Sequence, residues 1–170
     1  RLEAAARQFF ALPAAAKQQI AIAQTRHFRG YTGVGGEITR LQPDLREQID
    51  FGEELPAVPL SPETPQWWGL QGPNQWPQAQ PALQSEILLW LDTTRAVAQR
   101  LLKAFLVALE QPATALNQLV ASPHNHRLKI IHYPGQGSGQ PDQGVGPHKD
   151  GGLLTLLLQD QVGGLQVQMP

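Results

Sequence analysis

Hydrophobic positions in the N-terminal part of the chain recur at helical spacing. Apolar residues within 2–10 fall on one helix face, and Pro13 restricts the residue before it and interrupts the pattern. A second short helix is expected around residues 14–22. In residues 81–110, apolar side chains step along one face at intervals of three, four or seven, which predicts a long helix. Its apolar positions are Leu83, Ile87, Trp90, Leu91, Ala98, Leu101, Phe105 and Leu109.

After Ser122 the helical period gives way to short apolar runs that are typical of strands, and a shorter helix is expected just before this point, over 112–120. The loops GQGSGQPDQG and DQVGG separate the runs. A helical front half followed by short strands predicts an α+β fold. The expected strands are 126–134, 145–150, 153–159 and 165–169.

Two segments of the N-terminal half are expected to be mostly irregular. The glycine-rich stretch 28–40 reads as a loop with one or two short strands, and the proline-rich stretch 43–81 as a long loop. Trp67, Trp68 and Trp76 lie in this second loop and give it apolar area. We therefore expect it to pack onto the core and not to act as a disordered linker.

Composition narrows the range of functions. The 170 residues carry 13 Lys+Arg and 14 Asp+Glu, a net charge of −1 that offers no basic field for nucleic acid or a membrane surface. No apolar run is long enough to span a membrane, so a cytoplasmic protein is expected. The chain has no cysteine, so any metal must be bound by His, Asp, Glu or backbone oxygens. The sequence leaves the oligomeric state open.

His148 and Asp150 are the strongest candidate for chemistry. On a strand, residues i and i+2 point to the same side, so both side chains would project together ahead of a leucine-rich run. An imidazole and a carboxylate are two of the three ligands in the facial triad of non-haem Fe(II) oxygenases. A solvated turn, or a histidine oriented by a carboxylate as a general base, are the alternatives. Ser138 does not sit in a Gly-x-Ser-x-Gly nucleophile motif.

The surrounding motifs resemble one family. The segments LKIIHYPG and GVGPHKDGGLLTLLLQDQVGGLQVQ are similar to the core of the isopenicillin N synthase-like Fe(II)/2-oxoglutarate-dependent dioxygenases. Upstream, FFALPAAAKQQIA, RGYTGVGGEITRLQPDLREQIDFGEE and GPNQWP resemble the N-terminal elements of that family. The resemblance covers essentially the whole chain.

The resemblance implies roles for individual residues. His148 and Asp150 match the first two iron ligands, and Tyr133 matches a tyrosine that contacts 2-oxoglutarate in many members. Glu37 and Thr39 match a loop that borders the substrate in some members, with an ordinary surface loop as the alternative. The third iron ligand, a histidine, and an Arg-x-Ser that holds 2-oxoglutarate would both fall after residue 170. No catalytic residue beyond the metal ligands is expected.

Two further positions of the expected strand 126–134 bear on the same site. Lys129 is a candidate to face the pocket and contact substrate, with a solvated strand lysine as the alternative. Ile131 stands where plant members often have asparagine, which changes part of the 2-oxoglutarate contact.

The resemblance implies a jelly-roll (double-stranded β-helix) core, incomplete here. We expect a single domain over 1–170, an internal fragment made of N-terminal helices and loop (1–80), a helical support (81–122) and the first part of the barrel (123–170). The whole enzyme would use Fe(II) and 2-oxoglutarate to oxidise a small molecule with O2, with hydroxylation as the expected outcome and succinate and CO2 as products. These 170 residues alone are expected to be inactive. The alternatives are a 2-oxoglutarate-independent iron oxidase of the isopenicillin N synthase type and a non-catalytic metal-binding barrel.

Overall fold

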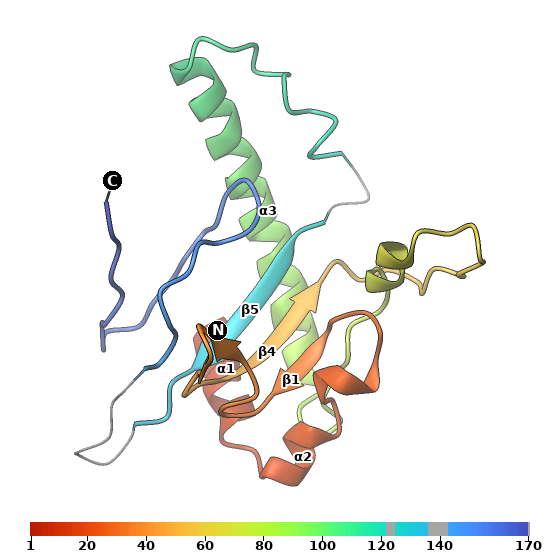
Figure 1. Ribbon diagram of the computed structural model, residues 1–170, viewed down its shortest axis with the longest axis vertical. Coiled ribbons are helices and arrows are strands. Elements are labelled where there is room, and N and C mark those ends of the chain that lie inside the picture. Colours follow the sequence, from red (N-terminus) through yellow and green to blue (C-terminus); the bar gives the residue numbers. More distant parts are fainter. Residues whose placement is uncertain (122–124, 136–142, 170) are drawn as a thin grey trace.

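The computed structural model describes residues 1–121, 125–135 and 143–169 of the chain. It combines helices with a three-stranded antiparallel sheet in the order β1-β4-β5 and a two-stranded ribbon, β2-β3 (Figure 1). The expectation of a mixed α+β chain is confirmed. The elements are α1 (Leu2–Phe10), α2 (Ala14–Gln18), the 3-10 helix η1 (Ile22–Gln24), β1 (Gly30–Thr32), β2 (Ile38–Thr39), β3 (Gln42–Pro43), β4 (Glu47–Gly52), the 3-10 helix η2 (Gln66–Leu70), α3 (Ala82–Ala108) and β5 (Arg127–His132).

Strand β4 lies at the centre of the three-stranded sheet, and its side chains alternate between the two faces. Ile49 and Phe51 belong to the hydrophobic core that α1 and α3 cover. Gln48 and Asp50 lie on the opposite face and hydrogen-bond to each other there. The sheet therefore has one apolar face, closed by helices, and one polar face.

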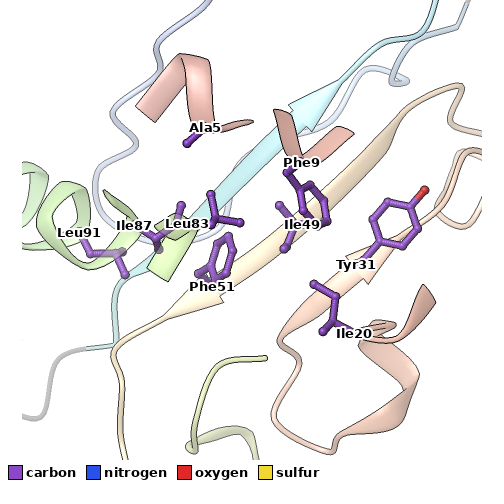
Figure 2. Close-up of a cluster of buried hydrophobic side chains, with 9 residues drawn as sticks. All are labelled: Ala5, Phe9, Ile20, Tyr31, Ile49, Phe51, Leu83, Ile87 and Leu91. Carbon is purple, nitrogen blue, oxygen red and sulfur yellow. The ribbon is translucent and has the colours of Figure 1, made fainter. Parts of the chain in front are cut away.

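The helix-covered face of the sheet forms the core (Figure 2). Phe51 and Leu83, from β4 and the first turn of α3, are 1% and 0% exposed and lie next to each other in the close-up. Burying an apolar side chain of this size stabilises the fold by about 1.5–3 kcal/mol. The buried members of the core are Ala5, Phe9, Ile20, Tyr31, Ile49, Phe51, Leu83, Ile87 and Leu91.

The prediction that residues 43–81 form a continuous loop is wrong at β4, where all six residues of Glu47–Gly52 are buried. The strand is short, and the prolines on both sides of it hide its signal. Its alternation of Ile49 and Phe51 with polar residues is nevertheless the pattern of a strand with one apolar face.

The rest of this proline-rich stretch packs onto β4 through side chains. Asn74 Oδ1 accepts the Gly52 N–H, and Asn74 Nδ2 donates to the Gly52 carbonyl, each at 2.9 Å. Trp76 stacks on Phe51 with ring centroids 5.2 Å apart, as expected for a loop that uses tryptophan to contact the core. Trp67 stacks on Trp68 and is 60% exposed.

The long helix is confirmed as α3, but its apolar stripe is only partly covered. Leu83, Ile87 and Leu91 are buried, whereas Leu101 and Phe105 are 38% and 53% exposed. In Figure 1 the second half of α3 extends beyond the sheet. Among the described residues, no helix has both the length and the apolar character needed to cross a membrane.

Three of the four expected strands and one short helix are not formed. The strand expected over 126–134 is confirmed as β5, but 145–150, 153–159 and 165–169 contain no strand, although their backbone is described. Leu153 and Leu157 are 60% and 59% exposed. A strand exists only when a neighbour pairs with its backbone, and these segments pair with none of the described residues. Residues 112–120 form successive turns in place of a helix.

Candidate metal and substrate site

The polar face of the sheet carries a network of charged side chains. Gln48 Nε2 donates to Glu37 Oε1 at 2.7 Å and to Asp50 Oδ2 at 3.0 Å. Lys129 Nζ lies 3.3 Å from Glu37 Oε1 and 3.5 Å from Asp50 Oδ1. Arg46 Nη2 pairs with Glu37 Oε2 at 2.8 Å. The structure thus brings two candidate substrate residues that are far apart in the sequence, Glu37 and Lys129, into direct contact.

Two features of this face are unusual: a carboxyl group with a raised pKa and buried polar atoms without a hydrogen-bond partner. Burial raises the pKa of the Asp50 carboxyl above its usual value, Lys129 opposes this effect, and the negative charge of Glu37 adds to it. Within the described residues, Gln48 Oε1 and Arg46 Nε are buried without a hydrogen-bond partner. Unpaired buried polar atoms are uncommon in folded proteins and often mark places where a ligand, an ion or water completes the structure.

The segment that leads to His148 is fastened beside this face. The Leu45 N–H donates to the Gln143 carbonyl at 3.1 Å, and the Gly146 N–H donates to Asp44 Oδ1 at 3.4 Å. Thr39, the third candidate substrate residue, donates its hydroxyl to Asp44 Oδ2 at 2.8 Å. Thr39 therefore lies where the ribbon meets this segment, with its hydroxyl committed to Asp44.

His148 and Asp150 lie side by side, with His148 Nε2 3.3 Å from Asp150 Oδ1. The strand that was expected to align them is absent, and a local hydrogen bond orients the imidazole in its place. His148 Nδ1 lies 2.8 Å from the carbonyl oxygen of Gly146, which can only accept, so Nδ1 carries the proton. The other ring nitrogen, Nε2, then faces the Asp150 carboxylate. Metal-binding histidines use the same arrangement, with the second ring nitrogen held by a carbonyl.

The donor set suits a divalent metal of borderline hardness. His148 and Asp150 offer one imidazole nitrogen and one carboxylate oxygen, and their side chains are 48% and 52% exposed and thus accessible. In the part of the chain that the structure describes, no group of three or more His, Cys, Asp or Glu side chains is arranged so that it could hold a metal ion. The pair therefore fits two positions of a three-ligand Fe(II) site.

Tyr133, the candidate 2-oxoglutarate contact, follows directly after β5 and is 48% exposed. Its ring lies against the backbone of Gly144. A Cβ atom at Gly144 would come within 2.8 Å of Cδ1 and Cε1 of the tyrosine. Only glycine allows this approach, which places Tyr133 next to the segment that carries His148.

A second charged cluster lies at the first residue of β4, Glu47, on the face of the sheet that the helices cover. Glu47 accepts hydrogen bonds from Lys17 Nζ at 2.7 Å and from Tyr31 Oη at 2.6 Å, and its Oε1 lies 2.8 Å from His132 Nδ1. Burial raises the pKa of the Glu47 carboxyl, but the hydrogen bonds from Lys17, Tyr31 and His132 outweigh it and leave that pKa below its usual value. Burial and the bond to Glu47 raise the pKa of the Tyr31 phenol. This cluster joins α2, β1, β4 and β5 and serves as scaffold.

Two described histidines that match no family ligand have structural contacts. His27 Nδ1 lies 2.9 Å from the Gly69 carbonyl, and His132 belongs to the Glu47 cluster. Sequence reasoning missed Asp44, Arg46 and Asp50, which surround the candidate residues. The available signal was the charged run DLREQID, at the end of which Gln48 and Asp50 alternate with the apolar Ile49 and Phe51.

Two sequence families match the chain. Residues 1–79 match the family described as "non-haem dioxygenase in morphine synthesis N-terminal", and residues 124–170 match the 2OG-Fe(II) oxygenase superfamily. The second match contains His148 and Asp150.

Curated relatives agree with these families. The chain is 34% identical over 164 residues to the 2-oxoglutarate-dependent dioxygenase frbJ of Dothideomycetidae sp., covering 94% of this chain and 44% of the relative. It is 32% identical over 174 residues to homoarginine-6-hydroxylase 2-ODD-C23 of Glycine max, covering 95% and 50%. The chain thus spans about half the length of the curated relatives it matches.

Solved structures share the fold. A protein from Caulobacter crescentus assigned to the 2OG-Fe(II) oxygenase family superposes with a TM-score of 0.62 at 25% identity, covering 78% of this chain and 42% of that one. A full-length Neurospora crassa protein, solved in complex with alpha-KG and thymine, superposes with a TM-score of 0.59 at 23% identity, covering 78% and 41%.

Proposed function

Since the chain belongs to the 2OG-Fe(II) oxygenase superfamily, we propose that the whole protein oxidises a small molecule with O2, using Fe(II) and 2-oxoglutarate. The observation that carries this proposal is the His148–Asp150 pair, with His148 Nδ1 held by the Gly146 carbonyl and Nε2 facing the carboxylate. The pair lies within the segment that matches the superfamily.

His148 and Asp150 would hold the metal, and a histidine outside residues 1–170 would complete the ligand set. When bound there, Fe(II) together with 2-oxoglutarate and O2 would supply the oxidising power for hydroxylation of the substrate, with succinate and CO2 as products. The bond from His148 Nδ1–H to the Gly146 carbonyl fixes the plane of the imidazole, so that Nε2 is the ring nitrogen left to bind the metal.

The polar face of the sheet would bind the organic ligands. Tyr133, whose ring lies against Gly144, would contact 2-oxoglutarate. Glu37 and Lys129, 28% and 33% exposed at their side chains, offer one charge of each sign to the small-molecule substrate. Thr39 would border the same space. Its hydroxyl already donates to Asp44, so it would not hydrogen-bond to the substrate.

The polar face would become the inner face of a jelly-roll barrel. We propose that residues 1–170 form part of one domain, in which the helices and loop of 1–80 and the helix of 81–122 support the barrel that begins in 123–170, and β1 and β4 of 1–80 extend its first strand, β5, into a sheet. In that setting residues 153–159 and 165–169 would pair with further strands. The exposed leucines would then wall the site and exclude water.

The test uses the full-length protein and follows the release of CO2 and succinate from 2-oxoglutarate in the presence of Fe(II). The variants His148→Ala and Asp150→Ala should each abolish turnover, because each removes a metal ligand. Lys149→Ala is the matched control: the residue lies between the two ligands and is exposed, and its variant should keep the parent rate.

Continued decarboxylation in both ligand variants would contradict the metal assignment. Iron-dependent O2 consumption without loss of 2-oxoglutarate would instead support an oxidase of the isopenicillin N synthase type. Metal binding without any oxidation across a panel of small molecules would support a non-catalytic barrel.

A further inference from the structure

Asp44 joins the β2-β3 ribbon to the segment that carries His148. Asp44 is only 1% exposed, which is unusual for an acidic residue. Its Oδ2 accepts the Thr39 hydroxyl at 2.8 Å and lies 3.4 Å from Arg46 Nη2. Its Oδ1 lies 3.4 Å from the Gly146 N–H and 3.5 Å from Gln143 Nε2. One oxygen thus faces the ribbon side and the other faces the segment 143–146.

The backbone around Asp44 fixes where this carboxylate points. The Asp44 N–H donates to the Glu37 carbonyl and the Gly35 N–H donates to the Asp44 carbonyl, both at 2.9 Å. The next residue, Leu45, donates its N–H to the Gln143 carbonyl at 3.1 Å. Because these bonds hold the main chain on both sides, the carboxylate is a rigid acceptor for the incoming segment.

Gly146 is the point of contact, and only glycine fits there. A Cβ atom at Gly146 would lie 2.7 Å from Thr39 Cγ2 and 3.1 Å from Thr39 Cβ. The carbonyl of the same residue receives the His148 Nδ1–H at 2.8 Å. A continuous chain of contacts therefore runs from Asp44 through Gly146 to the imidazole.

We propose that Asp44 is a positioning residue for His148. By fastening the Gly146 amide against the ribbon, it sets where the Gly146 carbonyl lies and hence where His148 Nε2 points. The inference rests on the proposed function, in which His148 is a metal ligand. It adds a buried carboxylate that binds no metal and contacts no substrate, but determines how well the ligand is placed.

The first test is an anaerobic Co(II) titration of the full-length protein, followed by visible absorption, with circular dichroism to confirm that each variant is folded. Asp44→Ala should weaken Co(II) binding about 10–100-fold, the usual loss when a group that orients a metal ligand is removed. Asp44→Asn keeps the shape and one acceptor oxygen, and should lose less. The matched control is Glu47→Gln, which also removes a buried carboxylate but has no bond to segment 143–146. Its Co(II) affinity should equal that of the parent.

The second test acts on the other side of the contact. Gly146→Ala inserts a methyl group against Thr39 and should weaken Co(II) binding with little change in melting temperature. Adding Thr39→Ser removes the nearest obstructing atom, Cγ2, and retains the hydroxyl that Asp44 accepts. The double variant should regain part of the lost affinity, an outcome that general destabilisation would not produce.

The possible results separate the two levels of the proposal. If His148→Ala abolishes Co(II) binding but Asp44→Ala and Gly146→Ala both bind like the parent, the positioning role is overturned and the metal assignment stands. Equal losses for Asp44→Ala and Glu47→Gln, or no rescue by Thr39→Ser, would also overturn it. If His148→Ala binds Co(II) like the parent, the proposed function itself fails.

Discussion

Two leucine-rich regions of the chain have opposite environments. In the first turns of α3, Leu83, Ile87 and Leu91 are buried against β4 and α1. Residues 153–158 hold five leucines in six positions, yet Leu158 is 77% exposed and no strand forms. Figure 1 shows this second region (blue) as an irregular trace beside the sheet.

The difference shows what each type of element requires. A helix satisfies its backbone hydrogen bonds within itself, so α3 continues to Ala108 even where Phe105 is 53% exposed. A strand must find its backbone partners in another strand, so hydrophobicity alone does not create one. The apolar pattern of 153–169 therefore indicates which side chains a strand there would bury. Whether the strand forms depends on a neighbouring strand that pairs with its backbone.

The largest expected effect comes from side-chain truncation in the two regions. Phe51→Ala should lower the free energy of unfolding by about 3–5 kcal/mol, because it removes a fully buried ring that stacks on Trp76. In residues 1–170, Leu157→Ala should change it by less than about 0.5 kcal/mol. In the full-length protein the same change should cost about 2–5 kcal/mol. Urea unfolding of both lengths measures this, and equal costs for Leu157→Ala would contradict the comparison.

The charged cluster on the helix side should also be costly to break. Glu47→Gln leaves the ammonium of Lys17, which is 7% exposed, without its counterion and should cost about 3–5 kcal/mol at pH 7. Equilibrium urea unfolding gives the value. The control is Glu3→Gln, which breaks an exposed ion pair with Arg7 and should change stability by less than about 0.5 kcal/mol.

The two faces of β4 should respond to pH with opposite sign. The pKa of Glu47 is lowered in the folded state, so the stability that this group gives is present above about pH 4.3, its unfolded pKa, and lost as the pH falls below it. The pKa of Asp50 is raised, so its contribution is present below about pH 3.9 and lost as the pH rises through the folded pKa.

Asp50→Asn should therefore raise the free energy of unfolding at pH 7 and leave it nearly unchanged at pH 3. Glu47→Gln should lower it at pH 7, with a smaller effect at pH 3. Urea midpoints at the two pH values measure both variants. A stabilising Glu47→Gln or a destabilising Asp50→Asn at pH 7 would contradict the opposite roles of the two faces.

The smallest effect is expected at the turn of the β2-β3 ribbon. Arg40 and Leu41 join the two strands with φ of 50° and 67°, and Leu41 is 96% exposed. A leucine is strained in this conformation, and two-residue turns of this kind favour glycine. Leu41→Gly should stabilise the protein by about 0.5–1 kcal/mol, measured by thermal unfolding. The control is Leu119→Gly in the turns of 112–120, where φ is not positive, and this change should not stabilise the protein.

Sequence patterns predicted the elements that depend on themselves or on near neighbours. The helices α1 and α3 and the strand β5 follow from apolar spacing. Strand β4 was missed because its six residues lie in a proline-rich stretch. The strands predicted for 153–159 and 165–169 were wrong because the sequence of one segment does not show whether another strand pairs with it. The apolar pattern of each segment was recognised, but its pairing partner could not be predicted.

The candidate site was predictable in its ligands but not in its supports. His148 and Asp150 were found from their spacing, yet the 3.3 Å approach between them is set by the Gly146 carbonyl and not by a strand. Asp44 lies 102 positions from Gly146, and no local pattern predicts that contact. The contact between Glu37 and Lys129 likewise becomes visible only once the fold brings them together.

Hydrogen–deuterium exchange read by mass spectrometry tests most directly whether pairing separates the two regions. In residues 1–170, peptides covering β4 and β5 should be protected, while peptides from 153–169 should exchange as fast as an unfolded chain. In the full-length protein, 153–169 should become as protected as β4. Protection of 153–169 in the shorter chain, or its continued rapid exchange in the full-length protein, would contradict this explanation.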